Sequence, residues 1–233
     1  MFSSAAHSET FTVVSDYWCP YNCDPKADPE GFGLDLLRQS FEAKGIQVKY
    51  VLKPWDQALA LAESNQVHAI MSANKTDSRK LKFPQYYFSR STNCFFKRPD
   101  DDWSFRGLAS LKGKKLAAIK SYSYGRLLDD YFQREHKAIH WGVGIDPLSL
   151  LLAKMDQGEI EIIIEDKHVF EYRQRATNQV DKYIEDYCLP AANIYMAFAP
   201  GHPDTKRFMK IYNDRMRVLL KGETYKQIMN RYK

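Results

Sequence analysis

Short apolar segments that suit β-strands alternate with amphipathic segments that suit helices through the first third of the chain. In the first helical segment Leu34, Leu37 and Phe41 fall on one face, and Gly45 after it suits a left-handed C-terminal cap. Because a helix between two strands joins parallel neighbours, this order predicts a parallel sheet flanked by helices, which is an α/β fold. Strands are expected at residues 11–15, 48–52 and 67–71, and helices at 32–44 and 54–62.

An aromatic and extended stretch at residues 83–99 interrupts this order, and the alternation then starts again. A change of composition of this kind marks a passage between two lobes. We therefore expect a second lobe with its own strands and helices, followed by an extended apolar run at 193–199. The second lobe should contain strands at 115–120, 139–141 and 160–165 and helices at 124–133 and 147–156, and the chain should close with helices at 204–221 and 223–232.

The two closing helices have no third set of strands to cover, so we expect them to return to the first lobe. The chain would then cross between the lobes twice, near residues 91–97 and near residues 187–195. The predicted division assigns residues 1–92 and 193–233 to lobe 1 and residues 93–192 to lobe 2.

The segments 58–72 and 151–165 share one design, in which an apolar helix, a short polar turn and a branched strand follow one another. Their weak identity indicates similar architecture in the two lobes rather than a proven duplication. The correspondence places residues 72–74 and residues 165–166, which include Asp166, at equivalent strand ends. With Arg79 close to the first of them, the lobes would face each other with opposite charges, which suits a zwitterionic ligand.

The end of the third strand carries polar residues suited to binding. Ser72 and Asn74 follow the apolar run, and a Thr76-x-x-Arg79 step should lead into a short helical turn. Ligands of α/β folds sit beyond the carboxyl ends of strands, and a guanidinium there can form two parallel hydrogen bonds to a carboxylate. The alternative is that Arg79 makes only a solvated surface ion pair.

Charge and composition exclude several classes of protein. The net charge is +5, but the 34 Lys and Arg are scattered, whereas a nucleic-acid-binding protein would gather them on one face. No apolar run approaches the ~18–20 residues of a membrane span. The six histidines are dispersed and no C-x2-C pair occurs, so we expect neither a metal site nor a cofactor.

The four cysteines leave the compartment open. Cys19 and Cys23 stand in a C-x3-C spacing, with Pro20 favouring a turn between them, and we regard them as the better candidates for a disulfide. Cys94 and Cys188 stand alone in the sequence, and buried free thiols remain the alternative. The small residues at positions 1–8 suit the remainder of a removed signal peptide, with a plain cytoplasmic start as the alternative.

Several short motifs occur together in a fixed order, at residues 18–21, 31–36, 69–79, 83–87, 111–116, 121–125 and 158–166. In this order the chain, from about residue 10 to residue 233, resembles the polar-amino-acid family of periplasmic solute-binding proteins, extracellular solute-binding proteins family 3 of ABC importers. The resemblance implies a two-lobed periplasmic-binding-protein fold (type II, Venus flytrap) with two hinge crossings. It also implies a periplasmic monomer that binds a small amino acid or carboxylate and delivers it to a membrane permease.

The resemblance also implies roles for individual residues. Arg79 matches the carboxylate-binding arginine of the family, and Asp166 matches the acid that pairs with an α-ammonium, although Asp166 could instead cap the following helix. Trp18 and Trp55 match pocket walls. The other expected ligand contacts are Asp16, the strand-end residues Ser72, Ala73 and Asn74, the extra cation Lys75, and the second-lobe turn Ser121, Tyr122 and Ser123.

The chain departs from the family pattern in three places: the Ser121-Tyr122-Ser123 turn, a shorter loop after Ser72, and the Cys19 and Cys23 pair. The resemblance therefore does not fix the ligand. Two functions other than transport stay open. One is a ligand-sensing domain of a signalling receptor, and the other is a cyclohexadienyl-dehydratase-like enzyme. The candidate acids and bases of such an enzyme are Asp16, His68, Glu165 and Asp166.

Overall fold

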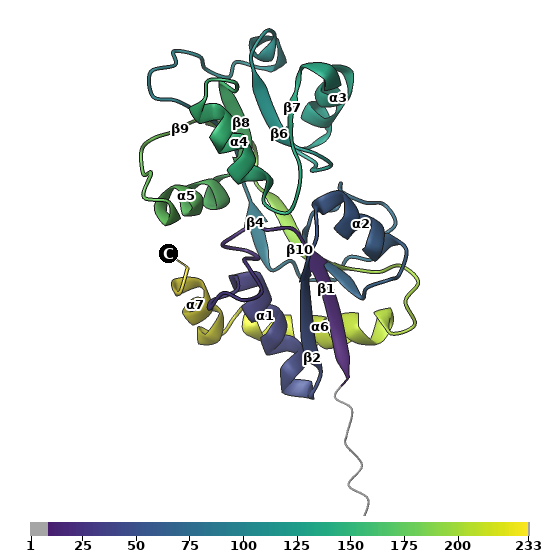
Figure 1. The fold of residues 1–233 in the computed structure, drawn as a ribbon. Coiled ribbons are helices and arrows are strands. Elements are labelled where there is room, and N and C mark those ends of the chain that lie inside the picture. The colour runs from purple at the N-terminus through teal and green to yellow at the C-terminus, as the bar shows by residue number, and fades with distance from the viewer. Residues whose placement is uncertain (1–8, 233) are drawn as a thin grey trace, which may run out of the picture.

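The computed structural model describes residues 9–232, so the expected remainder of a signal peptide at residues 1–8 lies outside the described range. The chain forms two lobes, each built on a five-stranded sheet (Figure 1). The first sheet has the order β2 (Gln47–Leu52), β1 (Thr10–Ser15), β3 (Ala69–Ala73), β10 (Ala192–Phe198), β4 (Ser89–Ser91). The second has the order β7 (His140–Gly142), β6 (Leu116–Ile119), β8 (Ile162–Asp166), β5 (Asn93–Lys97), β9 (Ile184–Cys188).

The helices cover these sheets. The first lobe holds α1 (Phe32–Phe41), the 3-10 turn Glu42–Lys44, α2 (Trp55–Glu63), α6 (Thr205–Leu219) and α7 (Glu223–Asn230). The second holds α3 (Arg126–Arg134), α4 (Pro147–Asp156), α5 (Lys167–Ala176) and the 3-10 turns Leu108–Leu111 and His136–Ala138. None of the helices between residues 9 and 232 has the length and apolar character needed to cross a membrane.

Both sheets are mixed, and the pairing explains the two lobes. Strand β1 pairs in parallel with β2 and β3, and β6 pairs in parallel with β7 and β8, as the strand–helix order predicts. The antiparallel strands are β10 and β4 in the first sheet and β5 and β9 in the second. These four strands flank the crossings, because β4 leads into β5 through Thr92 and β9 leads into β10 through residues 189–191. The predicted two-lobed α/β fold is confirmed.

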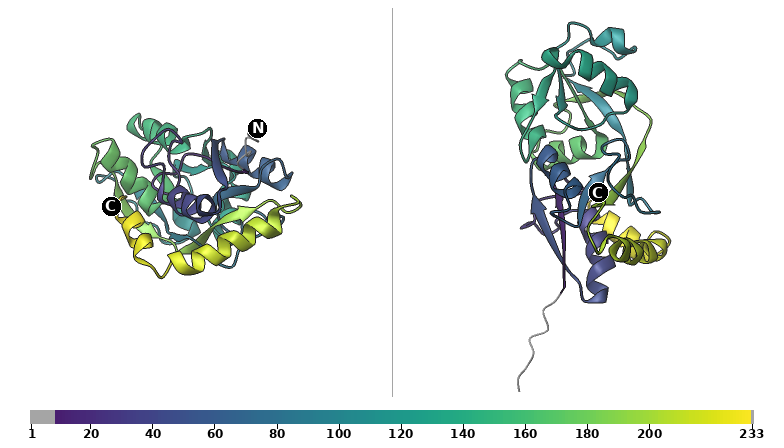
Figure 2. Two further views of the ribbon diagram at one scale, coloured as in Figure 1. Left: turned by 90° about the horizontal axis from the view of Figure 1, so that it is seen from below. Right: turned by 90° about the vertical axis from the view of Figure 1, so that its right-hand side faces the viewer.

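The C-terminal helices return to the first lobe, as expected. The ring of Phe208 on α6 packs edge-on against Phe11 of β1 and Phe41 of α1, with ring centroids 5.0 and 5.7 Å apart. In Figure 2 the yellow helices lie against the lobe that holds the N-terminus. The strands of the first sheet come from residues 10–91 and 192–198 and those of the second from residues 93–188, while the exact lobe boundaries stay a prediction.

The third strand begins two residues later than the sequence predicts. His68 places its ring against the neighbouring strand, where Nδ1 accepts a hydrogen bond from the main-chain N–H of Thr12 at 2.9 Å. The strand therefore begins at Ala69 and extends to Ala73, which brings Ser72 into it. The turn expected to be helical after Asn74 is a tight hydrogen-bonded turn, and α5 and β9 are additional elements of lobe 2.

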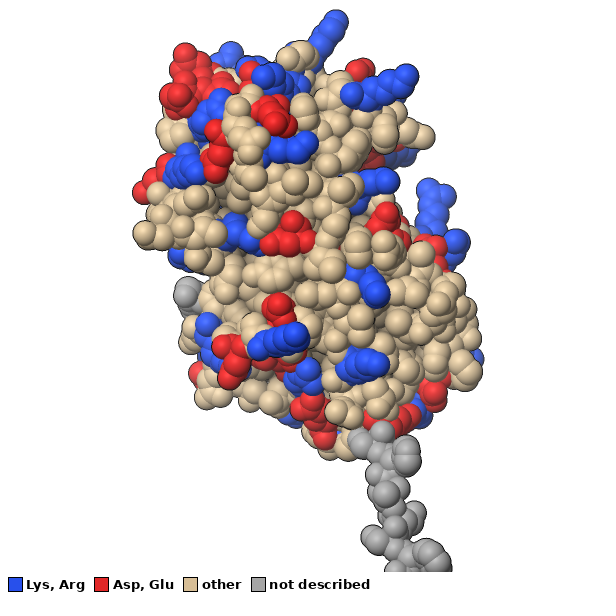
Figure 3. All heavy atoms as spheres, in the orientation of Figure 1, with Lys and Arg blue, Asp and Glu red and all other residues tan. Residues whose placement is uncertain are grey.

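Basic and acidic side chains are intermingled over both lobes on the face shown in Figure 3.

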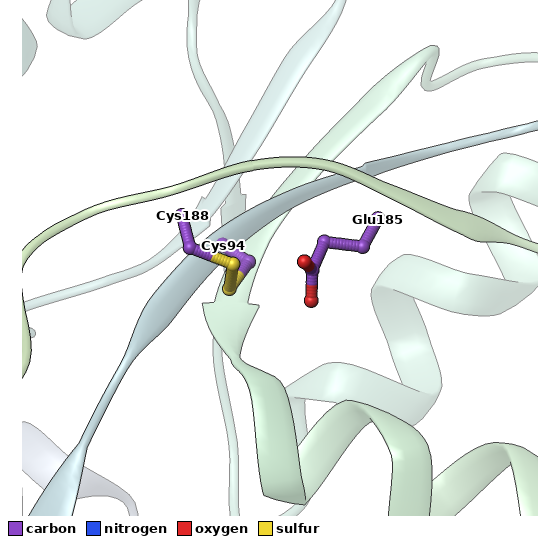
Figure 4. Close-up of side chains that lie close together, drawn as sticks. All are labelled: Cys94, Glu185 and Cys188. Atoms are coloured by element: carbon purple, nitrogen blue, oxygen red, sulfur yellow. A yellow bond between two sulfur atoms is a disulfide. The ribbon is translucent and has the colours of Figure 1, made fainter.

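Both cysteine pairs form disulfides, Cys19–Cys23 and Cys94–Cys188. Figure 4 shows the second bond beside Glu185, whose carboxylate forms a 2.8 Å ion pair with Lys167. Cys94, Glu185 and Cys188 lie close enough together to suggest a metal site. The sulfurs of Cys94 and Cys188 are bonded to each other, however, so neither offers a thiolate to a metal. The bond joins β5 to β9 directly beside the two crossings.

A cavity between the two lobes

A cavity of about 440 Å³ lies between the lobes. Its volume falls within the range of roughly 300–1,000 Å³ typical of small-molecule sites. Both lobes and both crossings contribute to its wall. The lining residues are Asp16, Trp18, Trp55, Ser72, Asn74, Lys75, Thr76, Asp77, Ser91, Asn93, Tyr122, Ser123, Tyr124, Gly125, Leu189, Pro190, Ala192, Asn193, Ile194 and Tyr195.

Tyr122 extends from lobe 2 into the first lobe. It follows β6, and its ring stands edge-on to Trp18 and Trp55, with centroids 6.4 and 5.5 Å away. Its hydroxyl donates a 2.6 Å hydrogen bond to Oδ2 of Asp16. These four side chains, all predicted ligand contacts, therefore form one wall of the cavity.

Asp16 is held at the end of β1 by the loop that carries Cys19 and Cys23. Within this loop Asn22 donates from Nδ2 to the main-chain oxygen of Asp16 at 2.7 Å and accepts a hydrogen bond from Ser72. The Asp16 carboxyl is almost completely buried, and this burial raises its pKa to about 7.

Asp77 is a lining residue that the sequence prediction missed. Its Oδ2 accepts the main-chain N–H of Asn74 at 2.6 Å, and its Oδ1 accepts Nδ2 of Asn74 at 3.2 Å and the N–H of Ser123 at 3.3 Å. Burial raises the pKa of Asp77 to about 7, and the nearby charges of Asp129 and Asp16 act in the same direction. The Asn74-x-x-Asp77 spacing, typical of a side chain that closes a turn, is the sequence signal that could have found it.

Arg79 lies outside this wall. Its side chain is exposed and makes no hydrogen bond or ion pair with any residue from 9 to 232. The tight turn at Asn74–Asp77 directs Asp77 toward lobe 2 instead. Arg79 therefore does not belong to the cavity wall, and the ligand contact expected for it stays a prediction. The charged residues of this loop that line the cavity are Lys75 and Asp77.

Three other expected contacts do not line the cavity: Ala73, Ser121 and Asp166. Ala73 is buried within β3. Ser121 is exposed, and its carbonyl accepts a 3.1 Å hydrogen bond from Nε1 of Trp55.

Asp166 caps α5 by accepting the N–H of Val169 at 3.1 Å, which is the alternative role considered from the sequence. Its other oxygen accepts hydrogen bonds from Ser91 Oγ and the N–H of Thr92, at 2.8 and 2.9 Å. Asp166 therefore holds the first crossing and does not line the cavity, and its expected ligand contact stays a prediction.

The remaining enzyme candidates, His68 and Glu165, lie in different lobes. His68 packs among Phe11, Phe208 and His202, away from the cavity. Glu165 is buried and accepts at Oε1 from Nε1 of Trp18 at 2.9 Å and from the N–H of Asp166 at 2.7 Å. Burial raises the pKa of Glu165 to about 8.

The lobes are in direct contact beside the cavity, so the structure is a closed form. The main-chain N–H of Tyr17 donates to the carbonyl of Ile145 at 2.8 Å. The hydroxyls of Thr76 and Ser123 lie 2.7 Å apart. Together with the contacts of Tyr122 and Trp18 described above, these bonds connect lobe 1 to lobe 2 along the whole cleft.

Sequence reasoning also missed the part of the wall that comes from the crossings. Ser91, Asn93 and residues 189–190 and 192–195 line the cavity because the hinge strands pass directly behind it. The predicted crossings near residues 91–97 and 187–195 carried the signal for these residues, since the hinge of a two-lobed protein forms the floor of its cleft.

Comparison with solved structures finds the same fold in binding proteins and in a sensor. A histidine kinase sensor domain with similarity to periplasmic binding proteins has a TM-score of 0.77 and 18% identity, covering 96% of this chain and 95% of that one. A structure from glutathione import through a cystine ABC importer of Streptococcus mutans has a TM-score of 0.77 and 16% identity, with coverages of 97% and 95%. An ancestral arginine-binding protein bound to glutamine has a TM-score of 0.75 and 15% identity, with coverages of 96% and 97%.

These identities establish the shared fold alone. Comparison with curated protein sequences finds no match. The model of the family of bacterial extracellular solute-binding proteins, family 3, matches residues 12–233, and the chain belongs to this family.

Proposed function

We propose that the protein is a periplasmic solute-binding protein that captures a small polar ligand, an amino acid or a related compound, and delivers it to the permease of an ABC importer. The observation that carries this proposal is the cavity, whose wall is shared by both lobes and by both crossings. A ligand in such a cavity contacts both lobes at once, so it stabilises the closed form more than the open one.

Closure would occur by rotation at the two crossings. Thr92 and residues 189–191 are the short connections between the sheets. The Cys94–Cys188 disulfide joins the strands on the lobe 2 side of both connections, so the two crossings would move as one hinge. The family membership and the shared fold support this mechanism.

A thermal-shift screen of the purified protein against amino acids, amines, organic acids, short peptides and sugars tests the proposal. A ligand at 100 times its Kd stabilises the folded state by about 2.7 kcal/mol, which raises Tm by several degrees. Small-angle scattering with and without the hit should show a compact bound form. If no compound in the panel binds, the proposal is overturned.

A ligand-sensing role is the second candidate, and the similarity to a histidine kinase sensor domain favours it. Deletion of the gene separates the two roles once a ligand is known. Loss of ligand uptake supports transport, whereas unchanged uptake with loss of a ligand-induced transcriptional response supports sensing.

We propose no catalytic role. The carboxyls of Asp16 and Glu165 are engaged with Tyr122 and Trp18, respectively, and His68 lies elsewhere. Incubation of the protein with its ligand should therefore return the ligand unchanged by mass spectrometry, and conversion of the ligand to a product would contradict this. We also expect a monomer, which sedimentation equilibrium can measure.

A further inference from the structure

The charges that line the cavity are mainly acidic. Asp16 and Asp77 face it from lobe 1, and no arginine belongs to the wall among residues 9–232. The cation of the lining is Lys75, an exposed side chain at the rim. Its Nζ lies 5.3 Å from the ring centroid of Tyr195.

The donors of the turn before α3, where a helix N-terminus could bind a ligand carboxylate, are already occupied. The N–H of Ser123 donates to Asp77, and the N–H of Tyr124 donates to Oδ1 of Asp129 at 2.8 Å. The hydroxyl of Ser123 donates to Oδ2 of Asp129 at 2.6 Å. Carboxylates of the chain itself therefore fill the position before α3 where the N–H groups of a helix N-terminus would otherwise favour a bound anion.

A carboxylate on the ligand would meet a second penalty. At this turn it would have to displace Asp77 from these donors and then lie next to the displaced acid. Two like charges within hydrogen-bonding distance repel each other, and a partly desolvated site screens this repulsion poorly. This part of the wall is thus unfavourable for a ligand carboxylate, the group that Arg79 was expected to bind.

The same wall has free capacity for a cation. A carboxylate can accept about four hydrogen bonds. Asp16 accepts two side-chain bonds, from Ser15 and Tyr122, and Asp77 accepts three, so both have acceptor sites left. The faces of the aromatic lining residues attract cations as well, as the position of Lys75 over Tyr195 demonstrates at the rim.

We propose that the cavity selects its ligand by a cationic group, an amine or a guanidine, that pairs with Asp16 and Asp77 against the aromatic wall, and that a carboxylate on the ligand is not required. This inference rests on the proposed binding function and specifies the ligand class for the same site. Asp16 and Asp77 are its specificity-determining residues.

Matched ligand pairs that differ only by a carboxylate test the inference directly. Titration calorimetry should compare agmatine with arginine and cadaverine with lysine. We expect each amine to bind at least as tightly as its amino acid. Tenfold or tighter binding of the amino acid overturns the inference and leaves the binding function intact, as does a hit confined to anionic or uncharged compounds. Absence of binding across the whole panel overturns both.

Variants locate the effect. Asp77→Asn and Asp16→Asn should weaken amine binding by at least tenfold, while Asp102→Asn, an exposed acid-to-amide control in lobe 2, should leave it unchanged. Arg79→Ala should also leave binding unchanged, and a tenfold loss in this exposed variant would overturn the inference.

Because Asp77→Asn could disturb the Asn74–Asp77 turn, Lys75→Gln gives a second test, in which the expected change in affinity has the opposite sign. Removal of the competing cation should tighten amine binding or leave it unchanged, and weaker binding contradicts the proposal.

Discussion

The hydroxyl of Tyr122 donates a 2.6 Å hydrogen bond to the carboxyl of Asp16, and the two residues belong to different lobes. The ring of Tyr122 also packs against three hydrophobic clusters within residues 9–232. One side chain of lobe 2 is therefore bound to lobe 1 by both polar and apolar contacts. This makes Tyr122 the residue whose removal should most affect the equilibrium between open and closed forms.

Tyr122→Phe should favour the open form. The substitution keeps the ring but leaves a buried carboxyl oxygen without its donor, which costs about 1–3 kcal/mol. The radius of gyration of the free protein, measured by small-angle scattering, should increase. Tyr131→Phe is the matched control, because the Tyr131 hydroxyl makes no hydrogen bond with any residue in the described part of the chain. Equal scattering curves for both variants would contradict the role of Tyr122.

The stability of the protein should fall as pH rises from about 5 to about 8. Burial raises the pKa of Asp16 to about 7 and that of Glu165 to about 8, from ordinary values of 3.8 and 4.5. Over this range the folded protein keeps protons that the unfolded chain has released, so the free energy of unfolding decreases with pH. One pKa unit corresponds to about 1.4 kcal/mol, and the total decrease should reach a few kcal/mol. Urea unfolding at several pH values measures it.

The surroundings of these two carboxyls specify the control for the pH experiment. Asp16 faces Ser15, Tyr122 and the charge of Asp146, and Glu165 faces Trp18, Asp166 and Asp16, with no cation among these groups. Asp16→Asn should therefore flatten the pH dependence by removing one titrating group. Stability that is constant or that rises between pH 5 and pH 8 would show that the two carboxyls are ionised in the folded state.

The two disulfides should have separable effects. The Cys94–Cys188 bond spans 94 positions and Cys19–Cys23 spans 4, so loop-closure entropy assigns about 4.7 kcal/mol to the first and about 2 kcal/mol to the second. The Cys94→Ala/Cys188→Ala variant should lose more stability in urea unfolding. The Cys19→Ala/Cys23→Ala variant should lose more ligand affinity, since that loop holds Asn22 and Trp18 at the cavity. The reverse ranking in either measurement would contradict this division.

Asp166→Ala should reduce stability without a matching loss of ligand affinity. The side chain caps α5 and holds Ser91 and Thr92 at the first crossing, but it does not line the cavity. Loss of a helix cap and of buried hydrogen bonds should cost about 2–4 kcal/mol in urea unfolding. A tenfold loss of affinity in a variant that still folds would instead support the ligand contact expected from the sequence.

Local signals in the sequence determined most of the elements. The helix α4 lies at the predicted residues 147–156, because Asp146 caps it and Pro147 suits its first turn, and both effects act within a few residues. Gly45 adopts the left-handed conformation expected after the first helical segment. The order of strands and helices likewise predicted the parallel pairing within each lobe, since this pairing follows from short-range connections.

Tertiary structure decided which charges of the 67–79 segment line the cavity, namely Lys75 and Asp77 but not Arg79. Asp77 and Arg79 stand two positions apart, and the sequence favoured the arginine because a guanidinium is the better partner for a carboxylate. Besides its local bonds with Asn74, Asp77 accepts the N–H of Ser123, a donor that is 46 positions away and comes from lobe 2. Asp16 likewise accepts a hydrogen bond from Tyr122, which is 106 positions away in lobe 2. The sequence by itself thus determined the two-lobed fold, whereas the tertiary structure decided which distant donors meet the two acids, because the hydroxyl of Tyr122 and the N–H of Ser123 come from the other lobe.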